Sequence, residues 1–341
     1  MTNNFWQNLH KPIFALAPME AVTDVCFREI FAKYGRPSVM FTEFVSTEGL
    51  AHVEGRKKLL IDLAYTESQR PIVAQIWGRD PQKFYDAAKL IRELGFNGVD
   101  INMGCPQDKE IAQQTCAYLI REPKLAQEII FATKAGWIAG FEGENEKELP
   151  VSVKTRIGYS QPETQSWIAN LLETFPAAIT VHGRTKKEKS KVLAHWDEIR
   201  KAVEVRNAHA SSQTLILGNG DIASREQALS RVAETGVDGV MIARGAFGNP
   251  WLFNADVGNS LKLFPTISER LLVMLEHAEL YEKKLNGHKP FIHMRKNFKA
   301  YCSGFAGAAE LRAKLMEVEN TTQAREIVEA YLGNKKTIML G

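Results

Sequence analysis

Short apolar segments rich in β-branched residues alternate with longer segments of helical periodicity along the first three quarters of the chain. Eight of the short segments predict strands, at residues 13–17, 39–45, 71–77, 98–102, 151–156, 177–182, 215–218 and 239–243. The intervening segments predict helices; residues 81–94, for example, place apolar residues on one face and stop at Gly95. Alternating strands and helices form a parallel sheet, and eight such units predict a (β/α)₈ TIM barrel. A doubly wound sheet is disfavoured because no G-x-G-x-x-G motif follows the first strand.

The pattern changes after the eighth predicted strand. Residues 261–267 contain Pro265 and are typical of a linker, and from residue 268 to about residue 332 the periodicity is helical throughout. We therefore expect a catalytic barrel at residues 1–255 and a small helical domain at residues 256–341. Two irregular segments, an acidic one at residues 139–150 and one at residues 206–212, are expected to be surface turns without a function.

Composition narrows the class of protein. With 341 residues, 45% of them hydrophobic, the chain can bury a sizeable core, and its net charge of +3 gives no general attraction for polyanions. No apolar run is long enough to cross a membrane, and no secretion signal begins the sequence. The four cysteines, Cys26, Cys105, Cys116 and Cys302, lack C-x-x-C spacing, so we expect a cytoplasmic protein without disulfides or a metal site.

Polar residues, often beside glycine or proline, follow nearly every predicted strand. In chain order these strand ends contain Ala17, Pro18, Met19 and Glu20; Glu43; Gln75; Asn102 and Cys105; Lys154 and Arg156; His182 and Arg184; Asn219, Gly220 and Asp221; and Arg244 and Gly245. Each side chain alone has an ordinary structural explanation, such as a hydrogen bond to the backbone or a place in the core. Because the carboxyl ends of barrel strands meet at one rim, together they predict a single pocket.

Two features of these ends indicate chemistry. The glycines at Gly218, Gly220 and Gly245 follow the last two strands, where backbone N–H groups bind phosphate in this fold. A lysine such as Lys154 suits the edge of a reduced flavin, so flavin mononucleotide (FMN) fits best. Cys105 lies between Gly104 and Pro106 on a bent loop. It is either a reactive thiol or a small buried apolar residue, as free cysteines usually are. If it is not the reactive thiol, Cys116 is the alternative.

The helical tail is locally basic. Residues 282–299 contain a single acid, Glu282, and six cations: Lys283, Lys284, Lys289, Arg295, Lys296 and Lys299. A run of charges usually forms a solvated surface. Here, however, the cations are interleaved with residue types that can stack on RNA bases or hydrogen-bond to them, namely His288, Phe291, His293, Phe298 and Tyr301. The segment after the sixth strand adds Arg184, Lys186, Lys187, Lys189 and Lys191. These clusters predict an RNA partner.

Several motifs together resemble those of one family, the tRNA-dihydrouridine synthases. They are residues 17–24 (APMEAVTD), 42–45 (TEFV), 100–106 (DINMGCP), 153–158 (VKTRIG), 181–185 (VHGRT), 218–221 (GNGD) and 242–246 (IARGA), with 294–296 (MRK) and 307–312 (GAAELR) in the tail. The resemblance implies a monomeric enzyme that binds FMN and reduces specific uridines in tRNA, with NADPH as reductant and Cys105 as proton donor to C5 of uracil.

The resemblance also assigns residues. It implies flavin contacts for Ala17, Pro18, Met19, Gln75, Asn102, Lys154, His182, Asn219, Gly220, Asp221, Arg244 and Gly245, and contacts with the substrate uridine or the rest of the tRNA for Glu43, Lys109, Arg156, Arg184, Lys289, Arg295 and Lys296. The chain departs from the family pattern at Glu110, where valine is usual, and across residues 113–120, which lack the usual glycines. Two alternatives stay open: a catalytically altered tRNA-binding protein, and a flavin barrel acting on a small free pyrimidine.

Overall fold

The computed structural model describes residues 4–139, 149–210, 213–255 and 265–338. The chain divides into two compact units, one comprising Met1–Val25 and Pro37–Arg244 and the other Cys26–Arg36 and Gly245–Gly341. The predicted acidic turn falls largely, and the predicted linker partly, on residues 140–148 and 256–264, outside the described residues. No helix in the described ranges is long and apolar enough to cross a membrane.

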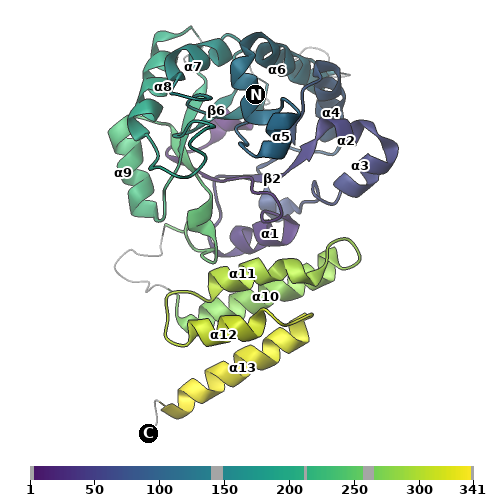
Figure 1. Ribbon diagram of the computed structural model, residues 1–341, viewed down its shortest axis with the longest axis vertical. Coiled ribbons are helices and arrows are strands. Elements are labelled where there is room, and N and C mark those ends of the chain that lie inside the picture. Colours follow the sequence, from purple (N-terminus) through teal and green to yellow (C-terminus); the bar gives the residue numbers. More distant parts are fainter. Residues whose placement is uncertain (1–3, 140–148, 211–212, 256–264, 339–341) are drawn as a thin grey trace. The chain divides into compact units, whose positions relative to one another are not determined.

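The first unit is a closed barrel of eight parallel strands, which confirms the predicted TIM barrel (Figure 1). The strands are β1 (Ile13–Leu16), β2 (Val39–Ser46), β3 (Ile72–Trp77), β4 (Gly98–Met103), β5 (Val151–Arg156), β6 (Ala178–His182), β7 (Leu215–Asn219) and β8 (Gly239–Ile242). Each strand pairs with the next in the chain, and β8 pairs with β1. Their burial is nearly continuous, as parallel strands covered on both faces require.

Helices surround these strands, and Figure 1 shows α4, α6, α7, α8 and α9 arranged around them. The helical elements of this unit are η1 (Phe5–Asn8), α2 (Thr47–Ala51), α3 (Val53–Leu59), η2 (Glu67–Gln69), α4 (Pro81–Glu93), α5 (Asp108–Ala112), η3 (Cys116–Arg121), α6 (Pro123–Ile138), α7 (Thr164–Leu172), α8 (Trp196–Ala208) and α9 (Arg225–Thr235). The short helix η5 (Arg244–Ala246) begins at the last residue of this unit. The prediction of an irregular segment from residue 206 was wrong at its start. The helix α8 continues through Ala208, because Arg206 is held there by Thr214 and Asp238.

The amino-terminal end of the barrel is built for stability. Trp6 of η1 is 1% exposed and packs in a buried cluster with Ile13, Phe41 and other residues of the strands. Nearby, the Asp238 carboxylate accepts hydrogen bonds from Lys11, Arg206 and the backbone N–H of Ile216. Catalytic residues of this fold lie at the other end of the barrel, at the carboxyl ends of the strands.

The second unit is helical. It contains α10 (Ile267–Leu285), η6 (Phe291–Met294), α11 (Arg295–Tyr301), α12 (Ala308–Leu315) and α13 (Thr321–Ile338), together with most of α1 (Val25–Tyr34). A reciprocal capping box between Thr266 and Glu269 starts α10. Contacts within this unit hold α1: Tyr34 and Lys33 both hydrogen-bond Glu276, and Lys284 pairs with Glu29.

Candidate active site

Strand register aligns the polar residues predicted at the rim. Asn102 of β4 is the register partner of Lys154 in β5, and Arg156 of β5 is the partner of His182 in β6. His182 is in turn the partner of Asn219 in β7. Four neighbouring strands therefore deliver these side chains to the same end of the barrel, as the sequence predicted.

A hydrogen-bonded network joins β3, β4 and β5. The Gln75 amide donates to the Asp100 carboxylate (2.6 Å) and accepts from the Asn102 amide (3.0 Å), while the Ser152 hydroxyl donates to the other Asp100 oxygen (2.6 Å). Burial raises the pKa of Asp100 to about 6, against the effect of these donors. Asp100 fixes which way the Gln75 amide points, a role that sequence reasoning missed because the residue lies within a strand.

The loop that carries Cys105 is fixed by its neighbours. The Asn102 side-chain oxygen accepts hydrogen bonds from the backbone N–H groups of Gly104 (3.0 Å) and Cys105 (2.9 Å). The Arg156 guanidinium donates to the Gly104 carbonyl (2.6 Å), and also to the carbonyls of Thr185 and Lys189 (3.0 Å each). Arg156, for which a substrate or tRNA contact is predicted, is thus buried and holds two rim loops together.

The thiols of Cys105 and Cys116 lie near enough to shift each other's pKa. Cys105 is half-buried and Cys116 is buried. A hydrogen bond from Cys116 lowers the pKa of Cys105, although burial and the charges of Glu110 and Glu20 act against it. Burial raises the pKa of Cys116 well above its ordinary value, so Cys116 is the protonated donor of the pair.

The segment without the usual glycines nevertheless adopts a glycine-like backbone. Gln114 has φ = 56° and Cys116 has φ = 54°, both in the left-handed region. Arg79 fastens the segment at both ends, through a hydrogen bond to the Gln114 carbonyl (3.0 Å) and an ion pair with Glu122 (2.5 Å). This strained turn brings Cys116 to Cys105.

Two basic side chains at the rim have lowered pKa values. Burial and the charge of Arg156 lower the pKa of Lys154 to about 8. Burial, followed by the charges of Arg156 and Lys154, lowers the pKa of His182 well below 6.5, so its imidazole is neutral at neutral pH. No ion pair within the described residues neutralises Lys154. A group with negative charge or an electron-rich edge would therefore be stabilised beside it.

Near the loops after β7 and β8, two arginines surround Asp221. Asp221 pairs with the buried Arg184 (2.5 Å) and with the exposed Arg244 (3.1 Å), and it accepts the Ala194 N–H (2.8 Å). Gly220 has φ = 137°, and a Cβ there would lie 2.6 Å from Ala194 Cβ. Gly245 lies within the short helix η5. Arg184, for which a substrate or tRNA contact is predicted, is 2% exposed and hydrogen-bonds Asp221 and His182.

Other predicted residues have structural partners or lie apart. The missing Cβ of Gly218 makes room for the Trp196 ring, and its predicted place in a phosphate site stays a prediction. Asn219 donates to the Met241 carbonyl (2.7 Å), and Met19 N–H donates to the Thr23 hydroxyl (2.9 Å). The remaining members of the predicted set differ in exposure: Ala17, Pro18 and Glu43 are buried, and Lys109 is exposed on α5.

In the second unit the basic segment is not one helix. The helix α10 ends at Leu285 and α11 begins at Arg295, with Lys289 between them and Lys296 in α11. The expectation that Phe298 and Tyr301 stack on RNA is wrong, because both rings are buried in this unit. Their spacing is that of a helix face in the core.

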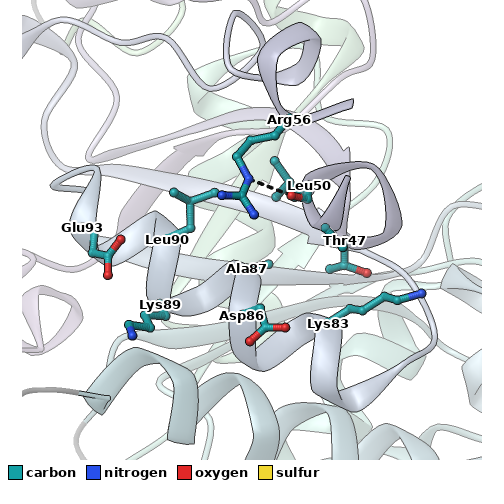
Figure 2. Close-up of a pocket in the computed structure, with 10 residues that line it drawn as sticks. Thr47, Leu50, Arg56, Lys83, Asp86, Ala87, Lys89, Leu90 and Glu93 are labelled. Atoms are coloured by element: carbon teal, nitrogen blue, oxygen red, sulfur yellow. Dashed lines mark hydrogen bonds between the residues drawn. The ribbon is translucent and has the colours of Figure 1, made fainter. Parts of the chain in front are cut away.

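A groove of about 310 Å³ lies elsewhere on the barrel, between α2, α3 and α4 (Figure 2). Two of its cations have protein partners: Lys83 pairs with Glu48, and Arg56 donates to the Leu50 carbonyl (2.8 Å). None of the rim residues described above lines it. The described residues include no cluster of His, Cys, Asp and Glu that could hold a metal ion.

Comparisons with known proteins agree with this geometry. The family model described as dihydrouridine synthase (Dus) matches residues 15–336. The chain is 39% identical over 334 residues to the probable tRNA-dihydrouridine synthase 2 of Bacillus subtilis (strain 168), covering 97% of both chains. It is also 39% identical over 333 residues to a probable tRNA-dihydrouridine synthase of Staphylococcus aureus (strain MRSA252), covering 97% of this chain and 96% of the other.

Solved structures share the fold at low identity. Histamine dehydrogenase from Rhizobium sp. 4-9 superposes with a TM-score of 0.51 at 12% identity, covering 73% of this chain and 47% of that one. An amine oxidase from Pseudomonas geniculata N1 gives a TM-score of 0.51 at 13% identity, covering 72% and 46%. These likenesses extend to the fold alone, whereas the family model and the close relatives cover nearly the whole chain. We conclude that the chain belongs to the dihydrouridine synthase family of enzymes.

Proposed function

We propose that this protein is an FMN-dependent tRNA-dihydrouridine synthase that uses NADPH and in which Cys105 donates the proton to C5 of the target uracil. The observation that carries the proposal is the Cys105 loop. Asn102 and Arg156 hold this loop at the rim, and the register partner of Asn102 is Lys154. The names of the close relatives support tRNA as the substrate.

The residues at the rim fit a flavin. The ammonium of Lys154 is desolvated and without an ion-pair partner among the described residues, so it would stabilise an electron-rich ring edge. Gln75 and Asn102 present an ordered pair of amides, and His182 a neutral imidazole. Arg244, whose side chain is 67% exposed, would meet the phosphate near Gly220 and Gly245. When bound, FMN re-reduced by NADPH supplies the hydride that C6 of uracil receives.

Cys105 suits the role of general acid. A proton donor works best when its pKa lies near the working pH, and the Cys116 hydrogen bond moves the pKa of Cys105 downward from its ordinary value of 9.0. Because Asn102 and Arg156 fix the backbone on either side of Gly104, the thiol is held in place before substrate binds.

Basic side chains on both units would bind the phosphates of tRNA. On the barrel these are the exposed Lys109 and the segment that contains Lys186, Lys187, Lys189 and Lys191. On the helical unit they are Lys289, Arg295 and Lys296. Phosphate contacts of this kind supply most of the affinity of such complexes and make it fall with salt.

The test is to incubate the protein with FMN, NADPH and unmodified tRNA and to count dihydrouridine by mass spectrometry. Dihydrouridine that accumulates only with all components supports the proposal. Binding of tRNA without any product would favour the catalytically altered protein, and reduction of free uracil or orotate but not tRNA would favour the small-pyrimidine enzyme.

A further inference from the structure

Two tyrosines and two cations gather on three loops at the carboxyl end of the barrel. We call Tyr118, Arg121, Tyr159 and Lys186 the Tyr118 cluster. The two tyrosine rings pack edge to face with centroids 6.0 Å apart, and the Arg121 guanidinium lies 5.3 Å from each ring centroid. The Lys186 ammonium lies 5.4 Å from the Tyr159 centroid. Tyr118 and Arg121 belong to η3 after β4, Tyr159 follows β5, and Lys186 follows β6.

The cluster is fixed relative to Cys105. The Ala117 N–H, next to Tyr118, donates to the Cys105 carbonyl (3.3 Å). The other two loops are joined by backbone hydrogen bonds from Lys186 to Gly158 and from Lys187 to Tyr159 (3.0 Å each). A molecule seated on the cluster would therefore lie at a defined position near the reacting thiol.

The hydroxyl and charged groups of the Tyr118 cluster form no hydrogen bond or ion pair with other described residues. Among the described residues, neither tyrosine hydroxyl has a hydrogen-bond partner, and neither Arg121 nor Lys186 forms an ion pair. Arg121 is exposed, and the two tyrosines and Lys186 are half-buried. A cluster that served packing alone would be buried, and its charges would be paired with carboxylates.

Aromatic rings beside unpaired cations are the means by which proteins bind single-stranded RNA. Bases stack on aromatic side chains and on guanidinium planes, while cations contact the phosphates between them. Stacking of this kind tolerates any base, because every base has a π face.

We propose that the Tyr118 cluster binds the nucleotide next to the target uridine, with its base stacked on the cluster and its phosphate at Arg121 and Lys186. This inference rests on the proposed function and adds a site that positions the substrate. The cluster would hold the RNA strand on one side of the target so that the target uracil reaches Cys105.

The experiment combines protein variants with altered tRNA in the full enzyme containing FMN and NADPH. Two tRNAs are prepared that each carry an abasic nucleotide, one 5′ and one 3′ of the target uridine. Dihydrouridine formation gives KM and kcat for the parent, Tyr118→Leu and Tyr118→Phe. Tyr85→Leu is the matched control, because Tyr85 is a half-buried tyrosine on the outer helix α4.

We expect Tyr118→Leu to raise KM for tRNA about tenfold, the effect of losing one base stack, while Tyr118→Phe restores the parental KM. One of the abasic tRNAs should raise KM of the parent by a similar factor and should not weaken Tyr118→Leu further. Tyr85→Leu should leave both the KM for tRNA and NADPH oxidation without tRNA unchanged. If Tyr118 has a purely structural role, Tyr118→Leu and the abasic nucleotide should act independently, and their factors on KM should multiply when the two are combined.

Two outcomes overturn the inference and are distinguishable. If the parent forms dihydrouridine but Tyr118→Leu has the parental KM, or if its effect multiplies with both abasic substitutions, the cluster does not bind a neighbouring nucleotide. If the parent forms no dihydrouridine at all, the proposed function itself is wrong.

Discussion

Replacing Lys154 with methionine should have two opposite effects: the flavin-free protein should become more stable, and the affinity for FMN should fall. The structure gives the reason, because burial and the charge of Arg156 lower the pKa of Lys154 from 10.5 to about 8. At about 1.4 kcal/mol per pKa unit, this difference corresponds to a cost of about 3 kcal/mol for carrying the charge at neutral pH. Solvent reaches the half-buried side chain, so we expect an actual gain of about 1–2 kcal/mol for Lys154→Met.

The pH dependence of this gain has a definite sign. The folded protein binds the Lys154 proton less tightly than the unfolded chain does, so the cost is fully present below pH 8. It disappears as the pH rises from about 8 toward 10.5, where the lysine is neutral in both states. The difference in free energy of unfolding between Lys154→Met and parent should therefore shrink over this range.

The assay is urea unfolding of the apoproteins at pH 7 and pH 10, with FMN titration of each. A hydrogen bond to a charged group is worth about 1.5–3 kcal/mol, so the Kd for FMN should rise about 10- to 100-fold in Lys154→Met. Lys109→Met, which changes an exposed lysine, is the control and should alter neither quantity. A less stable Lys154→Met apoprotein at pH 7, or a stability difference independent of pH, would refute the reasoning.

Three further predictions concern the thiol pair, the strained turn and the helical unit. Cys116→Ala removes a hydrogen bond that lowers the pKa of Cys105, so alkylation of Cys105 by iodoacetamide should shift to higher pH. Glu110→Gln removes a negative charge that raises this pKa and should shift the alkylation to lower pH. Shifts of the same sign would contradict these opposite effects of Cys116 and Glu110 on Cys105. Gln114→Gly, at φ = 56°, should raise the free energy of unfolding by up to about 1 kcal/mol in urea titrations, and Gln113→Gly, at φ = −85°, should lower it. Changing Arg295 and Lys296 to alanine should weaken tRNA binding and reduce its salt slope by about one per lost contact without changing FMN content; an unchanged affinity across a salt series would show that these cations are only solvated.

Much of the barrel could be predicted from the sequence, because each strand is a short apolar run and each connection has helical periodicity. The rim residues followed from the same reasoning, since parallel strands bring their carboxyl ends together. The structure places Gln75 and Asn102 in one hydrogen-bonded network with the loop of Cys105, and Lys154 is the register partner of Asn102; their roles in the site stay predictions.

What could not be predicted depends on contacts between residues distant in the chain. The expected substrate or tRNA contacts of Arg156 and Arg184 stay predictions, but their hydrogen bonds to backbone carbonyls and to Asp221 could not be predicted from local sequence. The burial of Tyr301 and the packing of α1 with the second unit are likewise tertiary effects that local patterns do not contain. The proximity of Cys105 and Cys116 needs a left-handed turn that the sequence, without glycine there, gives no reason to expect.

The most direct test of the central claim is a single-turnover measurement on Cys105→Ala. The enzyme is first reduced with NADPH and then mixed with unmodified tRNA, and the rate of dihydrouridine formation is compared with that of the parent. If the Cys105 thiol protonates C5, the variant should keep its FMN and be reduced by NADPH normally, yet form product about 10²–10⁴ times more slowly. The matched variant Cys116→Ala should stay within a few fold of the parent. Product formation by Cys105→Ala at the parental rate would contradict the assignment of Cys105 as the proton donor.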